Sequence, residues 1–110
     1  MAFETLEVAI ELAAALREPL ERLRRRDGDL ADQIRRAASS VALCVSEARK
    51  RGGKDRIHLF RVAAGSAAEV ATALRLAEAW GHLDASSLAE ALALADRILA
   101  MLWRLTHARR

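Results

Sequence analysis

The sequence predicts an all-α protein, an antiparallel up-down-up-down four-helix bundle. Hydrophobic residues make up 53% of the 110 positions, and there are 25 alanines but only one proline and five glycines. This composition is typical of closely packed helices, because alanine has the highest helix propensity. Apolar residues also recur three and four positions apart in four successive segments. Because the connections between these segments are short, neighbouring helices must alternate in direction, and the length fits one domain over residues 1–110.

The first helix is expected over about residues 3–26. Pro19 lacks a backbone donor and clashes with the carbonyl four residues earlier, which predicts a kink or a break near residues 15–18. The turn is expected at residues 27–29, with Asp29 as the N-cap of the next helix. The apolar row of this helix consists of Leu6, Ala9, Ala13, Leu16, Leu20 and Leu23.

The second and third helices are expected over about residues 29–51 and 54–80. Gly52 is predicted to cap the C-terminus of the second helix, and Gly81 that of the third. The row of the second helix consists of Leu30, Ile34, Ala37, Val41, Cys44 and Ala48. The row of the third consists of Ile57, Phe60, Ala64, Ala67, Ala71 and Leu74.

The fourth helix is expected over about residues 85–107, where Ser87 and Glu90 have the spacing of a capping box. Its main apolar row consists of Leu88, Ala91, Ala95, Ile98, Leu102 and Leu105. A second row, formed by Leu92, Leu99 and Trp103, exceeds what one core needs. An exposed apolar row usually marks an interface, so these three residues are the predicted oligomer interface.

The tight turn at residues 52–53 fixes which positions of the second and third helices face each other, because paired residue numbers should sum to about 105. Arg36 then falls opposite Glu69, and we expect an ion pair between them. Gly65, opposite Ser40, is predicted to be the point of closest backbone approach. Gln33 falls opposite Thr72. These polar residues are interpreted as setting the register rather than acting on a substrate.

The net charge of +3 is unevenly distributed. Residues 17–61 hold thirteen basic and seven acidic side chains, whereas residues 62–110 hold five of each. Two clusters stand out: four arginines over residues 22–26, and the bases around the turn at residues 52–53. The second cluster is the candidate phosphate-binding surface, and it consists of Arg49, Lys50, Arg51, Lys54 and Arg56.

Other kinds of site find little support in the sequence. Cys44 is the only cysteine, which excludes an intrachain disulfide and fits a reducing cytoplasm. No phosphate-binding loop, nucleophile elbow or metal-ligand spacing is present, so we expect no enzyme, no metal and no cofactor. The acidic start is unlike a signal peptide, and no apolar window reaches about 18 residues, so no membrane association is expected.

A set of positions in the second and third predicted helices forms a recognisable pattern: Gln33, Ile34, Arg36, Ala37, Ala38, Ser40, Val41, Glu47, Arg51, Val62, Ala63, Gly65, Ser66 and Glu69. This pattern resembles the four helix bundle protein family encoded in the intervening sequences of bacterial large-subunit ribosomal RNA genes. The accessory variability determinants of diversity-generating retroelements are related to that family. Cys44 and Ala48 stand where its members usually have asparagine and glycine.

The resemblance implies a bundle that assembles into a homo-oligomeric ring, often a pentamer, without established enzymatic activity. In the retroelement relatives it also implies contact of a basic surface with nucleic acid and with a reverse transcriptase. Two hypotheses follow for this chain. One is an oligomeric accessory module that binds the phosphate backbone of RNA or DNA, and the other is a purely structural or protein-interaction bundle with ordinary surface charges.

Overall fold

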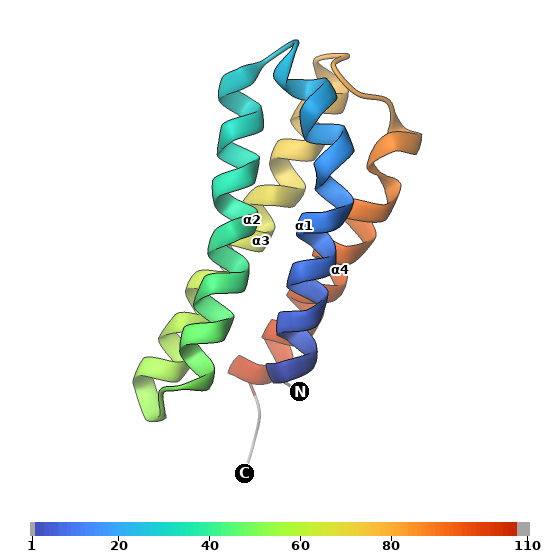
Figure 1. Cartoon of the computed structure of the whole chain (residues 1–110). Coiled ribbons are helices and arrows are strands. Elements are labelled where there is room, and N and C mark those ends of the chain that lie inside the picture. Colours follow the sequence, from blue (N-terminus) through green and yellow to red (C-terminus); the bar gives the residue numbers. More distant parts are fainter. Residues whose placement is uncertain (1, 108–110) are drawn as a thin grey trace.

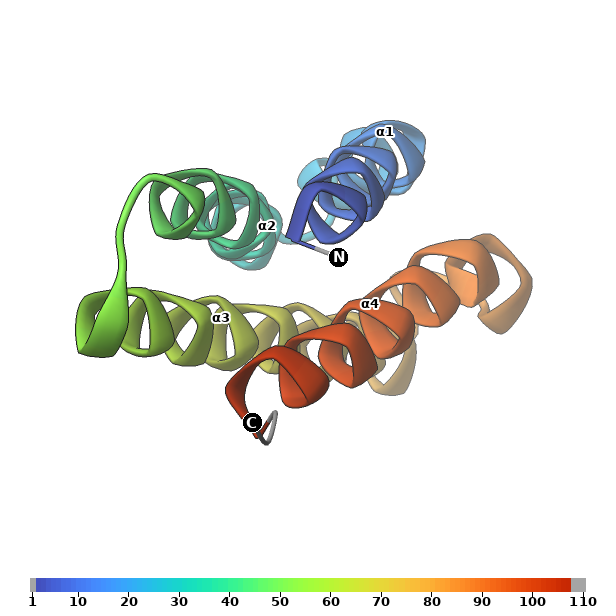
Figure 2. The same cartoon turned by 90° about the horizontal axis from the view of Figure 1, so that it is seen from below.

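The computed structural model describes residues 2–107, and within them four helices form an antiparallel bundle (Figure 1). They are α1 (Ala2–Arg24), α2 (Gly28–Arg49), α3 (Gly53–Ala79) and α4 (Ala85–Thr106). Helix α1 packs against α2 and α4, and α3 packs against the same two helices. Viewed from below, α1 and α2 form one layer and α3 and α4 the other (Figure 2). The predicted fold class is confirmed.

The core consists of apolar rows on all four helices. On α4 the predicted residues from Leu88 to Leu102 are buried, together with Met101, whereas the predicted Leu105 is only half-buried. On α3 the predicted positions Ile57, Ala64 and Ala71 are only half-buried. Because α3 packs against both α2 and α4, its buried stripe is wider than a single row and is centred elsewhere. It consists of Phe60, Ala63, Ala67, Val70, Ala73, Leu74 and Ala77.

Helices α2 and α4 begin at aspartate N-caps. The Asp27 carboxylate accepts a hydrogen bond from the Leu30 backbone N–H (3.1 Å), so the prediction of Asp29 as the cap is wrong. Gly28 is already helical, which places Asp29 in the first turn. The Asp84 carboxylate likewise accepts from the Ser87 backbone N–H (3.0 Å). Hydrogen bonding by the Ser87 side chain, by the Ser87 backbone N–H and by the Ser86 side chain lowers the pKa of Asp84.

The predicted capping box of Ser87 and Glu90 is also wrong. Helix α4 begins at Ala85, as expected, but its N-cap is Asp84, three residues before Ser87. Ser87 therefore occupies the third helical position rather than the cap. Its hydroxyl donates to the Asp84 carbonyl oxygen at 2.9 Å. The pair Asp84 and Ser87 therefore closes the first turn of α4.

The glycines at the ends of α3 adopt left-handed conformations. Gly81 has φ of 78°, and the N–H groups of Gly81 and His82 donate to the carbonyls of Glu78 and Ala77, each at 2.9 Å, as in a Schellman motif. At the other end Gly53 has φ of 61°, while Gly52 is extended. The prediction that Gly52 caps α2 is wrong, because Lys50 ends that helix in a right-handed conformation.

Helix α1 continues through Pro19 without interruption, so the predicted break is not observed between Ala2 and Arg24. Pro19 itself is buried. Leu16 and Leu20, on either side of it, are 1% and 8% exposed, and packing in the core outweighs the local cost of the proline.

Candidate nucleic-acid interface

The two basic clusters lie at opposite ends of the bundle, as the alternating topology predicts. The α1–α2 turn lies at the end that also carries the α3–α4 connection, and the α2–α3 turn lies at the other end (Figure 1). The α2–α3 turn carries the candidate phosphate-binding residues. Arg49 and Lys50 belong to the end of α2, and Lys54 and Arg56 to the first turn of α3.

Arg51 is held between two carboxylates. Its guanidinium lies 2.8 Å from the Glu47 carboxylate and 3.5 Å from that of Asp55. These acids compensate the charge of Arg51, so this residue contributes little net positive potential. The signal for this arrangement was present in the sequence, because Glu47, Arg51 and Asp55 are spaced four residues apart.

Two of the turn arginines lie over aromatic rings. The Arg49 guanidinium carbon is 5.3 Å from the centre of the Phe3 ring, and that of Arg56 is 5.5 Å from the Phe60 ring. Both arginines keep their charge, because a ring is attracted to a cation without neutralising it. The contact between Arg49 and Phe3 attaches the basic end of α2 to the start of α1.

Lys50 and Lys54 are the least engaged of the five. Both side chains are exposed, and neither forms an ion pair with a carboxylate described in residues 2–107. An ammonium on a flexible stem can follow an irregular phosphate backbone. Of the five predicted residues, Lys50 and Lys54 are thus the most available to bind a phosphate, and Arg51 is the least available.

A polar cluster links α2 and α3 near the middle of the bundle. The Gln33 side chain donates to the Glu69 carboxylate at 3.0 Å, and the Ser66 hydroxyl donates to that of Ser40 at 2.9 Å. The Ser40 hydroxyl also lies 3.8 Å from the Cys44 sulfur. These contacts fix the register of the two helices across a hollow of about 300 Å³.

The predicted ion pair between Arg36 and Glu69 is not formed. Both residues line the same hollow, but the side chain that bonds to Glu69 is Gln33. Arg36 and Glu69 are exposed, so water solvates both charges and neither requires a charged partner. Gly65 is also exposed, and a Cβ placed on it would meet nothing within 4 Å. The prediction of closest backbone approach at Gly65 is therefore wrong.

We expect Glu69→Ala to lower the free energy of unfolding by less than about 1 kcal/mol, because an exposed hydrogen-bonded carboxylate contributes little. Urea denaturation followed by circular dichroism measures this loss. A double-mutant cycle should show coupling of Glu69 to Gln33 and none to Arg36. Coupling to Arg36 of 1 kcal/mol or more would contradict the observed geometry.

The three predicted interface residues on α4 differ in exposure. Leu92 and Leu99 are half-buried and pack partly against the core. Trp103 is 61% exposed, and its ring stacks on His107 with centroids 4.3 Å apart. Of these three residues, only Trp103 offers a large apolar surface to another molecule.

Residues 2–107 contain neither a cluster of metal ligands nor a membrane-spanning helix. No three His, Cys, Asp or Glu side chains come together there in a way that could hold a metal ion. None of the helices in this range is long and apolar enough to cross a membrane.

The packing and helix order define the class of the protein, an antiparallel four-helix bundle with basic ends. The chain belongs to the 23S rRNA-intervening sequence protein family, whose model matches residues 2–104. A comparison with curated proteins gave no match. A crystal structure of a protein of unknown function from the S23 ribosomal protein family of Bacteroides thetaiotaomicron has the same fold, with a TM-score of 0.88 at 17% identity. The match covers 94% of this chain and 99% of that one.

Proposed function

We propose that this protein is a non-enzymatic, homo-oligomeric accessory module of the cytoplasm that binds the phosphate backbone of RNA through a basic surface. The family name refers to sequences that interrupt 23S ribosomal RNA. The resemblance described above adds a ring of subunits with a basic surface. DNA and a protein partner such as a reverse transcriptase are the other ligands that this resemblance suggests.

The observation that carries the proposal is the placement of the basic excess. Residues 17–61, with thirteen bases and seven acids, span the last part of α1, all of α2 and the first part of α3. These helices are neighbours, since α2 packs against both α1 and α3. The excess is therefore concentrated on adjoining surfaces, and an oligomer would repeat it around its axis.

The chemistry of the turn supports binding that is weakly selective for sequence. Within residues 2–107, Lys50 and Lys54 form no ion pair with a carboxylate, and the rings of Phe3 and Phe60 lie under Arg49 and Arg56. These two rings are therefore already engaged and are not offered to RNA bases for stacking. Contacts with phosphates would hold an RNA strand whatever its sequence.

A double variant tests the role of the turn. Replacing Lys50 and Lys54 with glutamine should reduce the slope of log affinity against log salt by roughly 1.4, because each contacted phosphate of a single strand contributes about 0.7. Fluorescence anisotropy of a labelled RNA measures this slope. The control is Arg75→Gln with Arg97→Gln, which makes the same charge change at exposed positions outside residues 17–61.

The control variant should bind as the wild type does. Equal affinity and equal salt slope in all three proteins would exclude the turn as a contact surface. Failure of the wild type itself to bind RNA at low salt would favour the alternative, a purely structural or protein-interaction bundle.

A further inference from the structure

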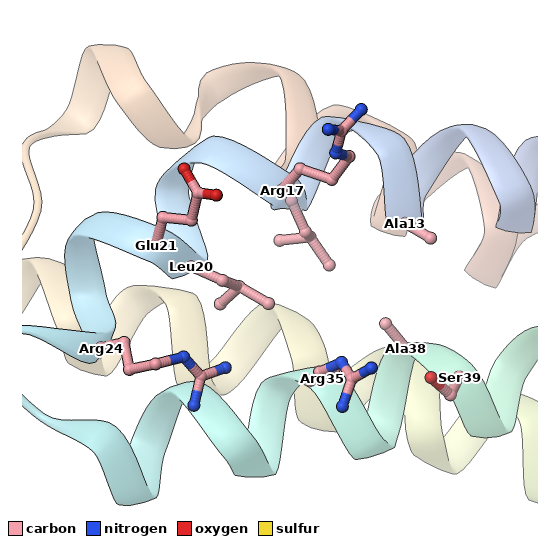
Figure 3. Close-up of a pocket in the computed structure, with 9 residues that line it drawn as sticks. Ala13, Arg17, Leu20, Glu21, Arg24, Arg35, Ala38 and Ser39 are labelled. Carbon is pink, nitrogen blue, oxygen red and sulfur yellow. The ribbon is translucent and has the colours of Figure 1, made fainter.

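A groove between α1 and α2 gathers arginines from both helices. The groove has a volume of about 270 Å³ and is lined by Arg17, Leu20 and Arg24 of α1 and by Arg35 and Ala38 of α2, among others. It lies apart from the α2–α3 turn, toward the other end of the bundle. Figure 3 shows the guanidinium groups of Arg24 and Arg35 between the two helices, whereas the Arg17 guanidinium and the Glu21 carboxylate are carried by α1 and point away from α2.

The arginines of the groove differ in how firmly they are engaged. Arg24 forms an ion pair with Asp32, and this hydrogen bond lowers the pKa of the Asp32 carboxyl. Arg17 and Arg35 form no ion pair with any carboxylate in the described part of the chain. Both guanidinium groups therefore keep their donors available for an anion.

The floor of the groove favours contacts with a guanidinium. Leu16, Leu20 and Ala38 are 1%, 8% and 4% exposed, so the exposed arginines lie beside a packed apolar surface. Electrostatic attraction is stronger near such a surface because the effective dielectric constant is lower. The pair between Arg24 and Asp32 is about half exposed and contributes little stability, so a phosphate can draw Arg24 toward itself at small cost.

We infer that this groove is a second phosphate-binding site, in which Arg17 and Arg35 each contact a backbone phosphate of RNA. Planar guanidinium groups match phosphate oxygens with two parallel hydrogen bonds, which a lysine cannot do. The inference rests on the proposed function and adds to it a specific site away from the α2–α3 turn. An RNA strand that contacts both sites would follow the surface of α2 along the bundle.

The test compares four proteins by fluorescence anisotropy with a labelled single-stranded RNA between 50 and 200 mM salt. They are the wild type, Arg17→Gln with Arg35→Gln, Lys50→Gln with Lys54→Gln, and the control Arg75→Gln with Arg97→Gln. The groove variant removes no ion pair. Raising the salt from 50 to 200 mM weakens RNA binding by the wild type. We expect the same rise to weaken binding by the groove variant roughly sevenfold less, because losing two phosphate contacts reduces the salt slope by about 1.4. Circular dichroism verifies that every variant is folded.

Each outcome has one meaning. A shallower slope in the groove variant with an unchanged control supports the groove site. If the groove variant matches the control while the lysine variant loses affinity, the groove inference is wrong and the proposed function stands. If the control loses as much as the groove variant, the effect is one of overall charge and no groove site exists. Absence of RNA binding by the wild type at 50 mM salt overturns the groove site and the proposed function together.

Discussion

Phe60→Ala is expected to lower the free energy of unfolding by about 3 to 5 kcal/mol. Phe60 is 1% exposed and is among the largest fully buried side chains of the bundle. Its neighbours in α3 include the buried alanines Ala63 and Ala67, whose short side chains cannot fill the space that the ring leaves. Domains of this size are stabilised by about 5 to 15 kcal/mol in total, so the loss is a large share.

Phe3 offers a matched control for this experiment. Like Phe60, it lies under an arginine, but it is 57% exposed. Phe3→Ala should therefore cost no more than about 1 kcal/mol, the size of an exposed cation–π contact. Urea denaturation measures the free energy of unfolding of both variants. The difference between the two losses gives the contribution of burying the Phe60 ring, because the arginine contact is common to both. Equal losses would show that the core around Phe60 is not packed as described.

Self-association is expected to depend on Trp103. A tryptophan that is 61% exposed beside the half-buried Leu99 is the kind of residue that anchors an interface. We expect the wild type to have a mass several times 12.1 kDa by light scattering, and Trp103→Glu to weaken the association by about 30-fold or more. Five copies is the number that the family resemblance implies.

Trp80→Glu is the control, because Trp80 is 69% exposed and lies at the end of α3, outside the proposed row. It should leave the mass unchanged. A wild type that remains at 12.1 kDa at micromolar concentration would exclude the oligomer. Dissociation by Trp80→Glu alone would instead place the interface at the other end of the bundle.

The fold could be predicted because four apolar rows with helical spacing leave few alternative arrangements. The predictions of the buried row of α3 and of the N-cap of α2 were wrong because in each case the sequence offers two equivalent choices. Alanines occupy so many positions of α3 that two overlapping rows fit the same spacing, and only packing against both α2 and α4 selects Ala63 over Ala64. Asp27 and Asp29 can both cap a helix, and only the path of the turn decides that Asp27 does.

The candidate site was only partly predictable. The partners of Arg51 follow from spacing within one stretch of chain, whereas the contact of Arg49 with Phe3 joins residues far apart in the sequence. The choice of Gln33 rather than Arg36 as the partner of Glu69 depends on how α2 and α3 pack along their length. The rule that paired residue numbers sum to about 105 uses only the turn between the two helices, so it could not predict that Gln33 is the partner of Glu69.

RNA binding through backbone phosphates is tested by the affinity of the wild type for two unrelated single-stranded RNAs at several salt concentrations between 50 and 200 mM. We expect similar affinities for the two RNAs and a linear fall of log affinity with log salt, with a slope of about −0.7 for each phosphate contacted. Absence of binding at 50 mM salt, or binding that does not change with salt, would contradict this expectation.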